Sequence, residues 1–162
     1  MNNRGSIQDL LLIGAVLLVA SFFILFGYKI ASEFNAHVQT DSHFDARARS
    51  ATSTLTAYYP GVVNNSFLYL TIGMCLVTLV LAALVRIHPI FIPFFFIGLV
   101  LVIFFSGVLS NIYQTLAANT AIAAQAVELT KISMVMNRLP YYIGVFGIIL
   151  MIVMYKTWSV NQ

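Results

Sequence analysis

One stretch of the sequence brings together side chains that can ligate metals: His37, Asp41, His43 and Asp45. On an unbroken helix His37, Asp41 and Asp45 would lie on one face, at i, i+4 and i+8, and their nitrogen and oxygen atoms suit a divalent ion. The alternative is a polar face at a turn, facing solvent or another subunit. Because no established ligand spacing is present, we favour the turn and predict neither a metal nor a cofactor.

The other polar side chains do not form a catalytic pattern. The sequence offers no serine, histidine and acid set, no paired buried carboxylates and no glycine-rich phosphate loop. Its eight Lys and Arg are scattered and lack the interleaved aromatics of a nucleic-acid surface. We therefore expect a protein that is not an enzyme and that binds no specific nucleic acid.

The elements that must position these residues are four uncharged apolar blocks at residues 10–28, 66–85, 90–110 and 141–155. With 60% hydrophobic and 8% charged residues, the chain differs sharply from water-soluble domains, in which about 25% of residues are charged. A bilayer's hydrocarbon core is crossed by about 20 apolar helical residues. We predict a single all-α integral membrane domain over residues 1–162, with transmembrane helices at 10–30, 66–85, 90–110 and 141–158.

Two long connections, residues 31–65 and 111–140, must lie on the same side of the membrane, because an even number of crossings returns the chain to its starting side. Apolar residues recur in both at steps of three and four, which predicts amphipathic helices. A straight helix over residues 32–57 would rise about 39 Å, whereas residues 58–65 could descend only about 26 Å. The first connection must therefore fold back or lie flat.

Local signals suggest where the chain turns. Thr40, Asp41 and Ser42, with Asp45 three residues after Ser42, resemble a capping box. We therefore predict that the connection breaks there into two short helices, one on each side of the break. Asn119 and Thr120 offer a weaker break in the second connection. The cluster Asn64–Asn65–Ser66 predicts the start of the second transmembrane helix, and residues 86–89 a tight turn between the second and third.

The interiors of the four blocks contain no acidic or basic residues, and their small polar residues are Ser21, Thr71, Cys75, Thr78 and Ser106. Ion-coupled carriers usually place charged residues in mid-membrane. Hydroxyls in such helices more often bond to their own backbone or join neighbouring helices. An oligomeric pore lined by backbone and hydroxyls stays open as an alternative.

Several short motifs spread over nearly the whole chain resemble a known group of proteins: Arg4-Gly5-Ser6, Tyr28-Lys29-Ile30 through Glu33-Phe34-Asn35, His88-Pro89-Ile90-Phe91, Ser110-Asn111-Ile112-Tyr113, Met136-Asn137-Arg138-Leu139-Pro140 and Tyr155-Lys156. The chain resembles the small polytopic membrane proteins of tailless icosahedral viruses that have an internal membrane and double-jelly-roll capsid proteins.

The resemblance implies a structural role in the virion's internal membrane. Before assembly the protein would lie in a host membrane. The protein would link the lipid vesicle to capsid, minor or other membrane proteins and to copies of itself as a homo-oligomer. It implies no catalytic or cofactor residue. On this interpretation the two connections form the contact surface, and the residues expected to meet partners or lipid headgroups are Glu33, Phe34, Phe44, Arg47, Arg49, Tyr113 and Arg138.

Two rival functions come from a different class: an oligomeric pore of the holin kind, and an accessory subunit of a membrane translocation complex. Holins usually end in a strongly charged tail, whereas residues 157–162 contain no charged side chain. Conductance of the purified protein in liposomes would separate a pore from a scaffold.

Overall fold

The computed structural model describes residues 7–84 and 92–159, and within these ranges the chain is helical with no strand. Six helices follow one another along the chain: α1 (Ile7–Thr40), α2 (Ala46–Leu84), α3 (Ile92–Ala117), α4 (Ala123–Glu128), α5 (Thr130–Asn137) and α6 (Leu139–Ser159). The predicted turn at residues 86–89 lies outside the described ranges.

Four of these helices, α1, α2, α3 and α6, are long and apolar enough to cross a membrane. Between 17% and 33% of the residues in their most apolar windows are buried inside the protein. The remaining apolar side chains face outward, such as Phe23, which is 75% exposed, and Leu84, which is 74% exposed. Outward apolar surface of this extent requires lipid as solvent, so the predicted all-α membrane fold is confirmed.

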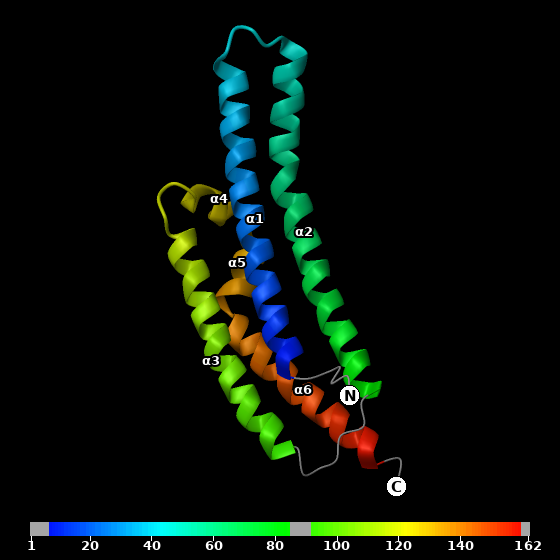
Figure 1. Ribbon diagram of the computed structural model, residues 1–162. Helices are drawn as coiled ribbons and strands as arrows, with labels where there is room; N and C mark the ends of the chain where they lie inside the picture. Colours follow the sequence, from blue (N-terminus) through cyan, green and yellow to red (C-terminus); the bar gives the residue numbers. More distant parts are fainter. Residues whose placement is uncertain (1–6, 85–91, 160–162) are drawn as a thin grey trace.

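The four long helices form an antiparallel bundle in which α1 and α2 lie side by side and α3 and α6 complete the other side (Figure 1). The α1–α2 turn and the short helices α4 and α5 lie towards the same end of the bundle, and α1 begins at the opposite end. The two connections therefore share one side, as the sequence predicts.

The first connection differs from the prediction in one respect. The break at residues 41–45 is confirmed, but the helices beside it are not short, because they are unbroken continuations of the membrane-crossing segments. With 34 residues, α1 is about 51 Å long, about 20 Å more than the hydrocarbon core. We call residues 30–59 the arm; it extends well beyond the end of α3 (Figure 1).

The second connection breaks twice and packs onto the bundle. A turn at residues 118–122 separates α3 from α4, in agreement with the predicted break at Asn119 and Thr120. Leu129 interrupts the chain between α4 and α5 with a non-helical ψ of 55°, and Arg138 ends α5. Pro140 explains the last break, because it has no N–H with which to continue the hydrogen bonding of α5 and it suits the first turn of a helix.

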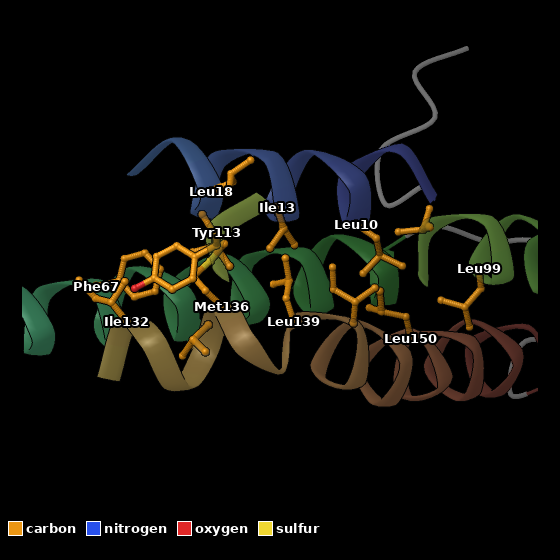
Figure 2. Packing of buried hydrophobic residues seen from close by; sticks show 14 of the residues in the cluster. Leu10, Ile13, Leu18, Phe67, Leu99, Tyr113, Ile132, Met136, Leu139 and Leu150 are labelled. Carbon is orange, nitrogen blue, oxygen red and sulfur yellow. The ribbon is translucent and has the colours of Figure 1, made fainter. Parts of the chain in front are cut away.

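The core lies where α1 and α2 face α5 and α6 (Figure 2). Its fully buried side chains include Leu10, Phe67, Ile132, Met136 and Leu150. At the far end α3 and α6 approach closely, because Gly147 has no side chain: a Cβ there would lie 2.2 Å from Leu99 Cδ1. Small residues allow membrane helices to gain dispersion contacts that lipid cannot supply.

Candidate functional site

The tip of the arm uses its acidic side chains to close the turn. Asp41 Oδ1 accepts a hydrogen bond from the backbone N–H of His43 at 2.9 Å and lies 2.7 Å from His43 Nδ1. His37 Nε2 lies 3.8 Å from Asp41 Oδ2. The bonds from His43, first its N–H and then its ring, lower the pKa of the Asp41 carboxyl below its usual 3.8. Asp45 instead accepts from the N–H of Ala48 at 2.7 Å and caps α2.

The tip therefore separates the residues that an unbroken helix would have aligned. His37 and His43 stay beside Asp41, whereas the Asp45 carboxylate is bound to the first turn of α2. Within residues 7–84 and 92–159, no group of three His, Cys, Asp or Glu side chains could hold a metal ion. The geometry is that of a capped turn, as favoured from the sequence.

The two arginines of the arm have different surroundings. Arg49 is half-buried, and its guanidinium donates to the carbonyl oxygen of Asp41 at 2.9 Å. Gln39 Nε2 donates to the carbonyl oxygen of Arg49 at 2.8 Å, so Arg49 joins the two helices across the tip. Arg47 is exposed. Of the pair, Arg47 is the one whose side chain is available to a partner.

The arm also presents apolar side chains where most proteins expose polar ones. Phe34 is 55% exposed and Ile30 66% on α1, and Leu55 and Tyr58 are each 71% exposed on α2. Glu33 lies beside Phe34 and pairs with Lys29 at 3.0 Å, while Phe44 at the tip is half-buried. The structure thus places Glu33, Phe34 and Arg47 on the surface of the arm.

Tyr28 and Tyr59 hold the base of the arm. Their rings stack with centroids 5.0 Å apart, and the Tyr59 hydroxyl donates to the carbonyl oxygen of Ile24 at 3.3 Å. This approach depends on Gly27, because a Cβ there would lie 2.8 Å from the Tyr59 hydroxyl oxygen. The Tyr28 hydroxyl in turn donates to the carboxylate of Glu128 at the end of α4.

Asn64 carries a role that the sequence does not reveal. It is 6% exposed and lies inside α2, so the prediction that it caps a helix is wrong. Its Nδ2 donates to the carbonyl oxygen of Glu128 at 3.1 Å, and its Oδ1 accepts from the N–H of Lys131 at 3.1 Å. The Asn64 side-chain amide thereby hydrogen-bonds a backbone carbonyl before the interruption at Leu129 and a backbone N–H after it. We call Tyr28, Tyr59, Asn64, Glu128 and Lys131 the junction.

The remaining two predicted contact residues belong to the second connection, and one departs from expectation. Tyr113 is 1% exposed, and its hydroxyl lies 2.9 Å from Ser133 Oγ, so it packs α3 against α5 and does not meet a partner. From sequence alone, a tyrosine such as Tyr113 can be either a headgroup anchor at the membrane surface or a buried ring whose hydroxyl is hydrogen-bonded. Arg138 is exposed between α5 and α6.

The four hydroxyls singled out in the interiors of the apolar blocks bond to their own helices. Ser21 donates to the carbonyl oxygen of Leu18 at 2.7 Å, and Thr78 to that of Met74 at 2.9 Å. Ser106 and Thr71 follow the same pattern at 2.7 and 2.8 Å. Of the two interpretations of these hydroxyls, the structure supports bonding within the helix.

A shallow groove of about 440 Å³ lies between α1 and α2 where the two helices separate. Apolar side chains form most of its wall, among them Leu12, Leu70 and Met74. Its polar members are Asp9 and Thr78, and the Thr78 hydroxyl donates to the carbonyl oxygen of Met74 within its own helix. In a bilayer such a groove is open to acyl chains.

In comparisons with known proteins, no family model matches the chain, and no curated protein or solved structure matches it.

Proposed function

We propose that the chain is a structural membrane protein of a virion's internal membrane, in which the bundle anchors the protein in lipid and the arm links it to capsid or minor proteins. One observation carries the proposal: α1 and α2 each continue, without a break of their own, about 20 Å or more beyond the hydrocarbon thickness. Together they present Phe34 and Arg47 on the part that extends out of the bilayer.

Rigidity supports an attachment role for the arm. Each of its helices is continuous with a helix of the bundle, including α2, which stays helical through Pro60 at the base of the arm, so the tip is joined to the lipid-embedded part by uninterrupted helix. The tip is closed by Arg49, Gln39 and Asp41, and the base by the stacked pair Tyr28 and Tyr59. A pre-ordered contact surface loses little conformational entropy when a partner binds.

The virion setting rests on the resemblance of the short motifs given above. Two of them coincide with places where the fold changes direction or meets another element: Tyr28 begins the second motif at the junction, and Arg138, which follows α5, lies in another. On this proposal these motifs hold the arm and the second connection in place, and the exposed residues between them contact the partner.

The test is the yield of assembled particles from an Arg47→Glu variant. Arg47 is exposed, so charge reversal should leave membrane insertion and folding intact while lowering particle yield through lost pairing with an acidic partner surface. Arg47→Lys is the matched control and should assemble normally. Arg49 is unsuitable for this purpose, because it closes the tip and its reversal would also disturb the arm.

Two measurements decide against the proposal. Normal yield of particles with Arg47→Glu would remove the arm as the attachment surface. A sustained selective current from the purified protein in liposomes would favour the pore alternative instead. Imaging the chain in its native assembly would then show whether a capsid shell lies above the arm.

A further inference from the structure

We propose that the arm pairs with the arm of a second copy through one apolar face, in a two-fold dimer whose axis is parallel to the membrane normal. This inference rests on the proposed assembly role and names the self-contact within it. It starts from the exposed residues Ile30 and Phe34 on α1 and Leu55, Tyr58 and Val62 on α2, which are 55% to 71% exposed.

These five side chains lie on the same side of the arm and of the part of α2 that adjoins it. The two helices meet along half-buried or buried positions, Ala31, Asn35 and Val38 on α1 and Thr52, Thr56 and Tyr59 on α2. In both helices the exposed apolar residues come one position before this contact line: 30 and 34 before 31 and 35, and 55 and 58 before 56 and 59. An antiparallel pair has a local two-fold axis perpendicular to its plane, so equal offsets place residues on the same face.

The face continues into the part of the bundle that crosses the bilayer. Phe23 and Phe26 extend the α1 side, and Tyr69 and Leu76 extend the α2 side, each between 48% and 75% exposed. An occupant of the whole face must therefore offer apolar surface both in lipid and beyond it. A second copy inserted in the same direction meets this requirement, because it presents the same face over the same heights.

The α1 residues and the α2 residues of the face lie at matching heights along the membrane normal. Tyr28 stacks on Tyr59 and Gln39 binds Arg49, so these pairs are level within the arm. By the same register Leu55 is level with Ser32, between Ile30 and Phe34, and Tyr58 is level with Lys29. A two-fold axis along the membrane normal sets α1 of one copy opposite α2 of the other, so Leu55 of the second copy enters the space between Ile30 and Phe34, as in ridge-and-groove packing.

Charge is complementary at the tip in the same arrangement. Arg47 lies about one helical turn above Ala51 and two turns above Leu55 on the same side of α2, and it is level with Thr40, next to Asp41. At the start of α2, Arg47 follows the capping residue Asp45 by two positions, and the end of α1 carries His37 and is followed by Asp41. Each copy thus sets the exposed Arg47 guanidinium opposite the Asp41 end of the other copy's turn, and a closed two-fold contact forms two such pairs. A lowered particle yield for Arg47→Glu therefore counts for the capsid attachment only where the crosslink described next is absent.

Crosslinking tests the arrangement with single cysteines in a Cys75→Ala background. Phe34→Cys and Leu55→Cys copies, carrying different tags, are co-expressed in native membranes and treated with a short thiol crosslinker. We expect the mixed pair to give a band at twice the 17.9 kDa of the chain, and neither variant alone to do so, because like positions lie diagonally across the axis. Ala36→Cys with Ser53→Cys is the matched control: both residues are exposed, nearly level, and one position after the contact line.

Each outcome decides the proposal. A mixed-pair band above both the single variants and the control supports it, and Leu55→Asp should then abolish the band while the helical circular dichroism stays unchanged. Equal bands in the control, no band, or a crosslink to a protein of another mass overturns it. A failure here together with a lowered particle yield for Arg47→Glu would remove the self-contact and leave the assembly role standing.

Discussion

The two connections of this chain have similar sequence patterns but differ in how they pack. Each carries apolar residues at helical spacing, a polar break and a proline, yet the arm stands out from the bundle while α4 and α5 pack onto it. The contact line of the arm is made mostly of small and polar residues such as Ala31 and Thr52, with Val38 as its one fully buried aliphatic side chain. The second connection inserts Leu129, Ile132 and Met136, each fully buried. Amphipathic spacing shows that a helix has an apolar side, and other residues decide what covers it.

The largest test of this contrast removes an apolar side chain from each connection. Ile132→Ala should lower the free energy of unfolding by about 2 to 4 kcal/mol, since Ile132 is 0% exposed and its loss leaves a cavity. Ile30→Ala, at 66% exposed, should change the monomer by less than about 0.5 kcal/mol. Unfolding in mixed micelles with increasing denaturing detergent measures both, and equal losses would contradict the contrast.

A smaller effect is expected from removing the amide that secures the second connection. Asn64→Leu leaves the Glu128 carbonyl and the Lys131 N–H without their partner, at a cost of about 1 to 3 kcal/mol. We expect faster hydrogen exchange in α4 and α5 and unchanged exchange in the arm. Asn65→Leu is the control, because Asn65 is exposed and accepts only from the exposed Lys131 ammonium, not from the backbone of the second connection; equal exchange in the two variants would refute the role given to Asn64.

The base of the arm can be loosened without touching the second connection. Gly27→Ala pushes against the Tyr59 hydroxyl and should cost about 1 kcal/mol, the low end for overpacking. Gly61→Ala, with nothing within 4 Å of its Cβ, should be neutral or slightly stabilising, because alanine favours the helix over glycine. Thermal unfolding in detergent compares the two, and identical shifts would argue against the close approach of Tyr59.

The smallest expected effect concerns the tip of the arm. Because the hydrogen bonds from His43 lower the pKa of the Asp41 carboxyl below 3.8, they favour the closed turn at neutral pH, and their contribution is lost as the pH falls through that lowered pKa. The amide chemical shift of His43 should report this titration. In Asp41→Asn it should no longer titrate over the same range, and a retained titration would assign it to another group.

Composition and periodicity were sufficient to predict the four membrane-crossing helices, because the requirement for apolar surface in lipid acts on every residue of a span. The breaks at residues 41–45 and 118–122 were also predictable, since capping side chains act within a few residues of their own position. These features depend on local chemistry, which a sequence contains directly.

The predictions that fail do so where a local signal serves a distant element. Asn64 resembles a cap, but the backbone groups that it satisfies lie 64 and 67 positions away in the chain. The helix predicted to start there instead begins at Ala46 and continues through Pro60, with the stacked Tyr59 before the proline and Asn64 after it. Tyr113 resembles a surface anchor and is buried. Only tertiary packing distinguishes these alternatives.

The position of Asn64 also has a consequence for biogenesis. Its amide is synthesised before Glu128 and Lys131, the residues whose backbone it binds. A nascent chain that has inserted α1, α2 and α3 therefore holds an amide without its final partner, which is costly in an apolar setting. Completion of α4 and α5 relieves that cost, so the last third of the polypeptide finishes the folding of its first half.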